Sequence, residues 1–266
     1  MIEKEKTAGE TEAEDRKQQT GAASRSGGQE TTNRSGKQKT NRKGIGAAMS
    51  YQIAIDGPAG AGKSTIAKRV AKAKGFIYVD TGAMYRAMAY YLLKQGVDGT
   101  DEKTVGRVCR GADITIKYEK GEQVVCLNGE NVNDFIRTEE VGNMASLSSA
   151  NGEVRKRLTQ LQKELAKTND VVMDGRDIGT CVLPEADVKV YLTAGSKVRA
   201  QRRYKELAAK GISCDMKQIE EDIILRDRQD MTREIAPLRQ AEDAVLLDAS
   251  HLTIEQVTDR ILALCK

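Results

Sequence analysis

The sequence predicts an α/β fold, in which a parallel sheet of about five strands is wrapped by helices and carries a small inserted antiparallel β meander. Three observations predict it. A β-rich run, a glycine loop and a helical pattern follow one another over 51–75. Short apolar runs then alternate with helical patterns as far as 264, and one segment, 113–132, breaks the alternation. Continuous apolar strands that alternate with helices are typical of a parallel sheet covered on both faces.

The strand predictions rest on short apolar, β-rich runs, and the helix predictions rest on apolar residues spaced three or four apart. The predicted strands are 52–56, 76–79, 171–173, 188–192 and 244–248. The predicted helices are 63–74, 83–95, 138–167 with a break near 151–152, 197–210, 215–229 and 253–264. Thr253 and Gln256 stand at capping-box spacing, which marks the start of the last helix.

The segment DITIKYEKGEQVVCLNGENV, 113–132, alternates strand and turn signals rather than strand and helix signals. It predicts a strand, a turn at 119–122, a second strand, a turn at Asn128-Gly129 and a short third strand. A meander inserted at this point of the chain predicts a small lobe over a second substrate.

Residues 1–48 have a composition typical of disorder. They contain no aromatic residue, and their large apolar residues are limited to Met1, Ile2 and Ile45. Such a segment buries too little apolar surface to offset its ordering entropy, so we predict a disordered tail over 1–48 and a folded domain over 49–266. Met49 stands immediately before the first predicted strand, and a translation start at this residue is an alternative explanation of the tail.

Charge and cysteine content narrow the functional classes. The net charge is +4, but residues 1–48 hold 10 basic and 7 acidic residues, which leaves 33 basic and 32 acidic residues in the rest. A nearly neutral folded part argues against specific nucleic-acid binding. The five cysteines are dispersed and form no C-x-x-C pair, which favours a reducing cytoplasm over a disulfide or metal framework. No run is long enough to span a membrane.

The stretch IDGPAGAGKST, 55–65, fits the phosphate-binding pattern G-x-x-x-x-G-K-[ST] between a predicted strand and a predicted helix. Glycines let the backbone turn its N–H groups inward around a phosphate, and the helix N-terminus favours the same anion. Lys63 is predicted to place its charge against the outer phosphates of a triphosphate, and Ser64 to supply an oxygen to Mg²⁺. The predicted ATP-binding residues are Gly57, Pro58, Ala59, Gly60, Ala61, Gly62, Lys63, Ser64 and Thr65.

Transfer of a phosphoryl group needs a second anion site, and two clusters that follow predicted strands offer one. Thr81 and Arg86 lie in VDTGAMYRA, and Arg176 and Asp177 lie in MDGRDIGT. Loops at the carboxyl ends of parallel strands form the ligand crevice of such folds. The competing interpretations are an ordinary helix cap for the first cluster and a turn with a local ion pair for the second.

A third cluster, ILRDRQDMTREIAPL over 224–238, is rich in arginine and holds no lysine. If the preceding helix continues, Arg226, Asp230 and Arg233 share one face, and Pro237 ends the helix. Arginines on a mobile segment can close over transferring phosphates and exclude water, so we predict a helical lid over 215–237. A solvated helix end is the competing interpretation.

Five segments together resemble bacterial cytidylate kinases, and they occur in the same order: AIDGPAGAGKST, DTGAMYRA, IRTEEV, MDGRDIGT and TREIAPL. The resemblance covers essentially all of 51–264. It implies a P-loop kinase whose meander belongs to a monophosphate-binding lobe over 81–150. It further implies transfer of the terminal phosphoryl group of ATP to CMP or dCMP, giving CDP or dCDP and ADP.

The resemblance also implies roles by position. The CMP-binding residues that it implies are Thr81, Arg86, Ser146, Arg155, Arg176, Asp177, Asp230 and Arg233. Thr81 and Arg86 match residues that hold the CMP phosphate, and many family members carry Ser at the first of these positions. Ser146, Arg155 and Asp177 match residues that read the cytosine base.

Further roles complete the predicted reaction. Asp230 matches the ligand of a ribose hydroxyl, and the implied catalytic residues are Lys63, Arg226 and Arg233. Asp174, which ends its predicted strand, is a candidate for ordering a water on Mg²⁺. No protein nucleophile is needed, because positioning and charge stabilisation carry this reaction.

The sequence leaves two alternatives open. A kinase for another monophosphate, such as UMP, shares most of these features, and a P-loop protein that binds RNA or regulates another protein would use the tail. The expected partners are ATP with Mg²⁺ and CMP or dCMP, with no membrane and no specific nucleic acid. The expected protein is a cytoplasmic monomer, because the resemblance implies that one chain supplies the whole site.

Overall fold

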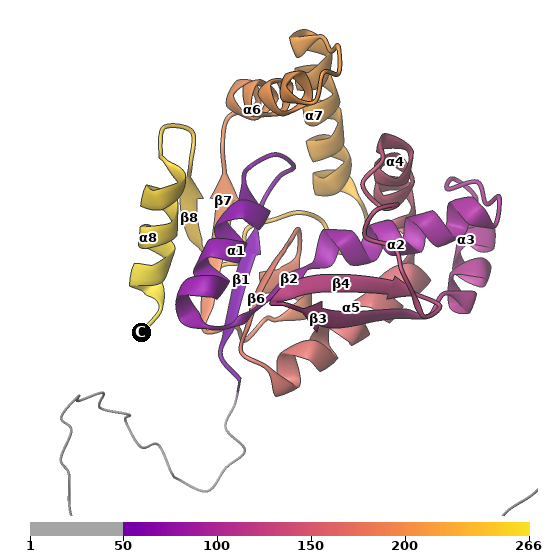
Figure 1. Cartoon of the computed structure of the whole chain (residues 1–266), viewed down its shortest axis with the longest axis horizontal. Helices are drawn as coiled ribbons and strands as arrows, with labels where there is room; N and C mark the ends of the chain where they lie inside the picture. Colours follow the sequence, from indigo (N-terminus) through magenta and orange to yellow (C-terminus); the bar gives the residue numbers. More distant parts are fainter. Residues whose placement is uncertain (1–49) are drawn as a thin grey trace, which may run out of the picture. The chain divides into compact units, whose positions relative to one another are not determined.

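Within residues 50–266, which the computed structural model describes, five parallel strands form the central sheet in the order β2-β6-β1-β7-β8 (Figure 1). The strands are β1 (Gln52–Asp56), β2 (Ile77–Asp80), β6 (Val171–Gly175), β7 (Val188–Thr193) and β8 (Val245–Asp248). The α/β class and the five predicted strands are confirmed, with ends shifted by one or two residues. The predicted disordered tail, 1–48, lies outside the described residues.

The helices between the strands match most of the predicted ones. They are α1 (Lys63–Lys74), α2 (Thr81–Lys94), α3 (Glu102–Val108), α4 (Glu139–Ser148), α5 (Gly152–Thr168), α6 (Ser196–Ala209), α7 (Met216–Thr232) and α8 (Ile254–Leu264). Two short turns, η1 (Cys109–Gly111) and η2 (Ile178–Val182), complete the set. The capping box predicted from Thr253 and Gln256 is present at the start of α8.

Two apolar layers sandwich the sheet, as its continuous apolar strands predict. Ile53 and Ile55 of β1 pack with α1 and α8 on one face, whereas Ala54 between them packs with α2 and α5 on the other. This alternation follows from the period of two in a β-strand. None of the helices formed by residues 50–266 is long and apolar enough to span a membrane.

The predicted meander is confirmed as a separate antiparallel sheet of β3 (Ile114–Glu119), β4 (Glu122–Leu127) and β5 (Glu130–Asn131). It is fastened to the end of β2. The side-chain amide of Gln123 accepts from Asp80 N at 2.8 Å and donates to Asp80 O at 3.1 Å, and the Tyr118 hydroxyl donates to Tyr78 O at 3.1 Å. The insert therefore supports the point where β2 passes into α2.

The structure departs from the predictions at three places. Asp80, Thr81 and Gly82 form no separate turn, because the Asp80 carboxylate caps α2 by accepting from Ala83 N at 2.9 Å. Helix α7 ends at Thr232, five residues before Pro237, so it is not the proline that ends it. Helix α3 and the single turn of η2 were not predicted, because short segments carry too little periodicity to be recognised.

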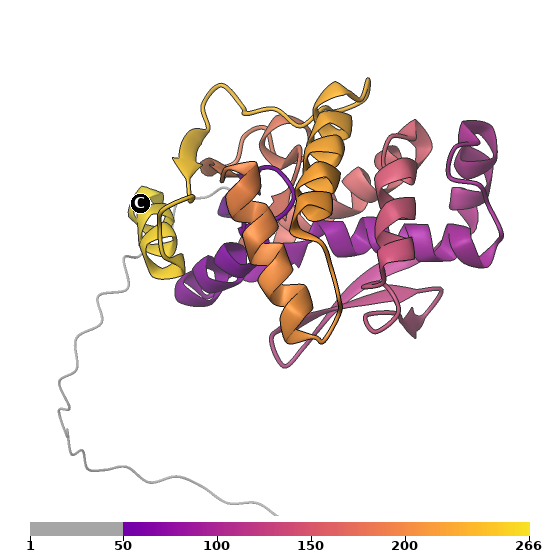
Figure 2. The ribbon, with the colours of Figure 1, turned by 90° about the horizontal axis from the view of Figure 1, so that it is seen from above.

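All five strands of the central sheet end at the same edge, and this edge positions the candidate site. The loop 57–62 follows β1 at the centre of the sheet, and the segments that follow β6 and β2 lie to one side of this loop. Helices α6 and α7 pack side by side above the edge (Figures 1 and 2). Ligands bind at this edge in open α/β sheets.

Candidate active site

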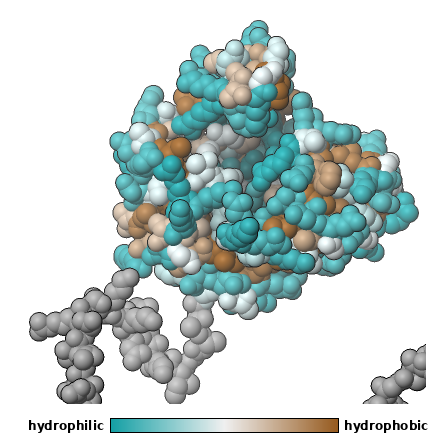
Figure 3. Space-filling view, viewed as in Figure 1, coloured by the Kyte–Doolittle hydropathy of each residue, from teal (hydrophilic) through white to brown (hydrophobic). Residues whose placement is uncertain are grey.

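A cleft of about 710 Å³ opens at the carboxyl edge of the sheet, below α6 and α7. The space-filling view shows a hollow there with mostly hydrophilic visible walls (Figure 3). Its walls come from the glycine loop, α2, α4, the segment after β6, α6, α7 and the start of α8.

Cations outnumber carboxylates on the walls of this cleft. Among the described residues that line it, the cationic ones are Lys63, Arg86, Arg137, Arg176, Arg199, Arg202, Arg203, Arg226 and Arg233. The carboxylates are Asp80, Asp174, Asp177, Glu206 and Asp230. Nine positive charges face five negative ones, although the chain outside the tail is nearly neutral. The cleft is therefore built to receive anions.

The glycine loop has the backbone that a phosphate cradle requires. Gly57 adopts φ +147°, and a Cβ there would lie 1.9 Å from the Leu192 carbonyl oxygen, so only glycine fits. Gly62 precedes α1 with φ +96° and brings the chain to the helix N-terminus. Lys63 is buried and donates from Nζ to Pro58 O at 2.7 Å. Burial, followed by repulsion from Arg176, lowers the pKa of Lys63 to about 7.

A cluster of two hydroxyls around the buried carboxylate of Asp174 lies beside the start of α1. The Ser64 hydroxyl donates to Asp174 Oδ2 at 2.8 Å, and the Tyr78 hydroxyl donates to Asp174 Oδ1 at 2.8 Å. Burial, with repulsion from Asp80, raises the pKa of Asp174 to about 6. Ser64 and Asp174 thus present oxygen ligands of the type that Mg²⁺ prefers, next to the phosphate loop.

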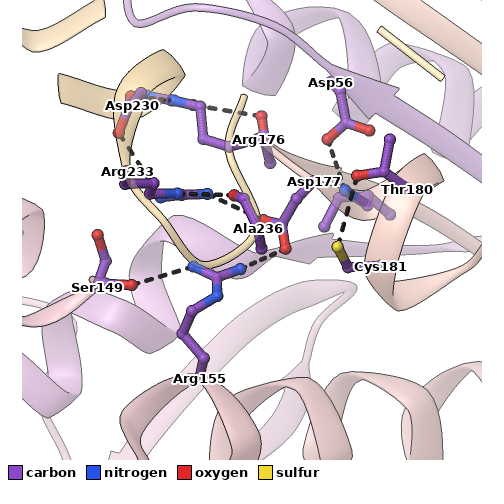
Figure 4. A network of polar contacts seen from close by, with 12 residues as sticks. Asp56, Ser149, Arg155, Arg176, Asp177, Thr180, Cys181, Asp230, Arg233 and Ala236 are labelled. Atoms are coloured by element: carbon purple, nitrogen blue, oxygen red, sulfur yellow. Dashed lines mark hydrogen bonds and ion pairs between the residues drawn. The ribbon is translucent and has the colours of Figure 1, made fainter. Parts of the chain in front are cut away.

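A second network lies at the other end of the cleft and joins β6, α5 and α7 (Figure 4). Asp177 is ion-paired through Oδ2 with Arg155, whose Nη1 donates to Ser149 O at 3.1 Å. Arg233 Nη2 lies 3.5 Å from Asp177 Oδ1, and its Nε donates to Ala236 O at 2.7 Å. Both oxygens of the Asp177 carboxylate therefore face guanidinium groups.

Asp230 connects this network to the phosphate side of the cleft. Arg176 Nε donates to Asp230 Oδ2 at 2.8 Å, and Arg233 Nη1 lies 3.7 Å from Asp230 Oδ1. Helix α7 does continue past the predicted end at residue 229, so Asp230 lies on it, and Arg233 follows its last residue as the C-cap. The lid segment and the segment after β6 are thus joined by charge pairs.

Two arginines of the cleft have less support than the others. Arg226 Nε is buried without a hydrogen-bond partner among residues 50–266. Burial, with repulsion from Arg176, lowers the pKa of Arg226. Burial, with repulsion from Arg137, lowers the pKa of Arg86. Both side chains are positioned for an anion that the protein itself does not provide.

The structure brings most of the predicted site residues to the walls of one cleft. The predicted residues on the walls are Ala59, Gly60, Ala61, Gly62, Lys63, Ser64, Thr65, Thr81, Arg86, Ser146, Arg176, Asp177, Arg226, Asp230 and Arg233. Gly57, Pro58 and Arg155 do not line it: the first two begin the loop directly after β1, and Arg155 is ion-paired with Asp177. The Thr81 hydroxyl donates to Asp174 O at 2.7 Å, so it must turn to reach a phosphate.

Sequence reasoning missed the arginines of α6. Arg199 is buried, donates to Ala59 O at 2.9 Å and pairs with Asp227 of α7 at 2.6 Å. Arg202 donates to Ala249 O at 2.7 Å, and Arg203 lines the cleft nearby. The signal was in the sequence, because residues 199, 202 and 203 share one face of a helix that follows a parallel strand.

An apolar corner at the start of α8 was also missed. Leu252, Ile254 and Val257 line the cleft there, beside Arg202 and the glycine loop. These residues come from the end of the chain, and nothing in their local sequence indicates a ligand. Only the folded topology brings them to the loop.

Comparison with known proteins gives a consistent result. The sequence profile of the family described as cytidylate kinase matches residues 53–266. The cytidylate kinase of Caldicellulosiruptor bescii is 51% identical over 212 residues, which cover 80% of this chain and 94% of that protein. The cytidylate kinase of Bacillus subtilis is 47% identical over 210 residues, which cover 79% and 94%.

A third relative and one solved structure complete the comparison. The cytidylate kinase of Shouchella clausii is 46% identical over 219 residues, which cover 82% of this chain and 97% of that protein. A shikimate kinase from Bacteroides thetaiotaomicron aligns with 81% of this chain and 98% of its own at 14% identity and a TM-score of 0.41, which is too low to carry an argument.

Proposed function

The chain belongs to the cytidylate kinase family, and from this premise we propose how its residues carry out the transfer of the terminal phosphoryl group of ATP to CMP or dCMP. The observation that supports the proposal is that a phosphate loop, the buried carboxylate of Asp177 and a surplus of arginines line one cleft. One end of the cleft holds the triphosphate, and the other holds the monophosphate.

ATP binds over the glycine loop. Its phosphates take the place of Pro58 O as the partner of Lys63, and the backbone N–H groups of the loop and of the start of α1 surround them. We place the adenine in the apolar corner of Leu252, Ile254 and Val257, because a flat aromatic base fits apolar walls next to a triphosphate site.

Ser64 and Asp174 are the residues that would hold Mg²⁺, directly or through water. The Ser64 hydroxyl and the Asp174 carboxylate lie 2.8 Å apart beside the loop, and both offer oxygen. The ion, when bound, neutralises charge on the transferring phosphate. For Asp174 to bind the ion directly, its carboxylate has to give up a hydrogen bond from Ser64 or Tyr78.

CMP binds against β2, β6 and α4. Thr81, Arg86 and Arg176 face its phosphate, and Asp230 faces its ribose. Asp177 accepts from the cytosine amino group, with Ser146 on the opposite wall. Arg155 orients the Asp177 carboxylate through their ion pair; to donate to the base itself, it has to release Ser149 O. Among the described residues, the other carboxylates that line the cleft are Asp80, Asp174, Glu206 and Asp230.

The segment 215–237 acts as a lid. Helix α7 is tied to the segment after β6 by the Arg176–Asp230 pair and to α6 by the Arg199–Asp227 pair. The transferred phosphoryl group then meets Lys63, Arg226 and Arg233, and the lid excludes water that would otherwise hydrolyse ATP. Catalysis on this account is positioning and charge stabilisation, without a protein nucleophile.

We propose that the enzyme works as a monomer in the cytoplasm. All residues assigned to the two ligands come from one chain. The five cysteines lie within the described residues and are all free, which suits a reducing compartment.

Release of ADP from ATP in the presence of CMP, dCMP, UMP or AMP tests the proposed function. We expect CMP and dCMP to be substrates, with kcat/KM for CMP exceeding that for UMP by a factor on the order of 10⁴, because the wrong base leaves buried polar groups unpaired. The Lys63→Met variant is the negative control, because it lacks the lysine of the phosphate loop and should release little ADP. A preference for UMP or AMP would contradict the assignment.

Arg226→Ala should lower kcat about 10²-fold while the KM for ATP changes little, because charge stabilisation by this guanidinium peaks in the transition state. Steady-state kinetics with CMP measure both constants. Arg228→Ala is the matched control, since Arg228 lies on the same helix but is exposed and outside the cleft. A rise in the KM for ATP alone would show that Arg226 only binds the ground state.

Asp177→Asn should reduce the CMP/UMP ratio of kcat/KM about tenfold or more, because the amide donates where the carboxylate accepts and so favours the uracil carbonyl. The KM for ATP serves as the internal control. Arg155→Met should act in the same direction through the loss of its ion pair with Asp177. Equal losses for both bases would mean that the base is read elsewhere.

A further inference from the structure

Asp56 lies between the two halves of the site and has no part in the function described above. It is the last residue of β1, immediately before the glycine loop, and its side chain is buried. Its neighbours in the sheet are Gly175 of β6 and Tyr191 of β7. A carboxylate at this depth needs partners, because an unpaired buried charge is costly.

The partners of Asp56 are two backbone N–H groups from a distant segment. Ile178 N donates to Oδ1 at 2.8 Å, and Gly179 N donates to Oδ2 at 2.7 Å, across more than 120 residues of sequence (Figure 4). These are the first free N–H groups of the η2 turn. Each oxygen holds one of them, so the carboxylate fixes both the position and the orientation of the turn.

Asp177 occupies the position that would normally cap this turn. An aspartate that precedes a helical turn commonly accepts from the first free N–H groups with its own side chain. Asp177 makes no such bond, and its backbone lies at φ −146° and ψ 26°. Because Asp56 caps the turn in its place, the carboxylate of Asp177 is free to face Arg155 and Arg233 on the opposite side.

We propose that Asp56 is a positioning residue for base selection: by capping η2 from β1, it holds Asp177 in the orientation that distinguishes cytosine from uracil. The proposal rests on the base-reading role proposed for Asp177. It gives a role to a buried carboxylate that stands before the glycine loop and does not line the cleft. It also means that the strand that carries the ATP loop sets the geometry of the CMP site.

The test compares Asp56→Asn with wild type in kcat/KM for CMP and for UMP. Asparagine has the same size but one acceptor oxygen, so one of the two backbone bonds is lost and an NH₂ group faces an N–H group. We expect the CMP/UMP ratio to fall at least about tenfold, mainly through a higher KM for CMP. An unchanged ratio would overturn the proposal, because the loss of a purely structural residue would lower kcat/KM for CMP and for UMP equally.

The control is Asp187→Asn, which weakens a similar bond at the other end of the same strand, where Asp187 Oδ2 accepts from Gln52 N at 2.8 Å. Its CMP/UMP ratio should match wild type. If Asp56→Asn fails to fold, as judged by thermal unfolding, Gly179→Ala decides. A methyl group there lies 3.3 Å from Lys189 Cδ and 3.4 Å from Asp56 Oδ2, which is tight enough to push the turn and the carboxylate apart by a few tenths of an ångström. We expect the same direction of change in the ratio.

The Asp177→Asn variant separates this proposal from the one on which it rests. If Asp177→Asn narrows the CMP/UMP gap and Asp56→Asn does not, the positioning role is wrong and the base-reading role stands. If Asp177→Asn leaves the gap unchanged, the base is read elsewhere, and Asp56 cannot act through Asp177 whatever its own variant shows.

Discussion

The excess of positive charge in one partly buried cleft is the constraint on which the rest of the structure depends. Lys63 is buried at the N-terminus of α1, where the helix dipole also disfavours a cation, and burial lowers its pKa to about 7. Arg226 is half-buried, and its Nε is buried without a hydrogen-bond partner among residues 50–266. Burying charge without a partner costs several kcal/mol, and the surrounding fold has to supply that stability. The phosphates of two nucleotides remove this cost.

The apolar layers around the sheet provide the rigid frame that this cleft needs. Strand β1 is covered on both faces, and its central position between β6 and β7 fixes the glycine loop relative to the segments on each side. Two carboxylates at the ends of neighbouring strands, Asp56 and Asp174, are also buried, and burial raises the pKa of each to about 6. Acidic and basic side chains with shifted pKa values thus lie close together beside the glycine loop, which is typical of functional sites.

The insert and the lid have different relations to this frame. The insert is fixed to the end of β2 by Gln123 and Tyr118, so it extends the rigid part of the molecule. Helix α7 is joined to the frame by the Arg176–Asp230 pair, and the Arg199–Asp227 pair joins α7 to α6. Helix α6 is joined to the frame by arginine side chains, since Arg199 donates to Ala59 O and Arg202 donates to Ala249 O. Charge pairs can exchange one partner for a phosphate at little cost, whereas a packed apolar contact cannot. We therefore expect the proposed lid, rather than the insert, to move when ligands bind.

The sequence predicted the sheet, the meander and the phosphate loop because these depend on local patterns, whereas the residues assigned to CMP came from the family resemblance. The strands of the central sheet are short continuous apolar runs, and the phosphate loop needs glycine at positions such as Gly57. It did not predict the arginines of α6 or the apolar corner of α8, because their roles depend on which strand lies next to β1. The Arg155–Asp177 pair also required the structure, since two residues assigned separately to the base bind each other instead.

The number of protons that the protein exchanges when ligand fills the cleft tests most directly whether the cleft is arranged to bind anions. The ligand is adenosine and cytidine joined by five phosphates. Calorimetric titration of the full-length protein with this ligand at pH 8, without Mg²⁺ and in buffers of different ionisation enthalpy, measures the number of protons exchanged on binding. Every bridging phosphate lacks a group that titrates near neutral pH, so the protein alone exchanges protons. Lys63 has a pKa lowered to about 7 and is mostly neutral at pH 8, and a phosphate beside it raises that pKa. We therefore predict net proton uptake by the wild-type protein and none by Lys63→Met. Proton release, or no proton exchange, in the wild type would contradict the claim that the unliganded cleft lowers the pKa of Lys63 and that bound phosphate raises it.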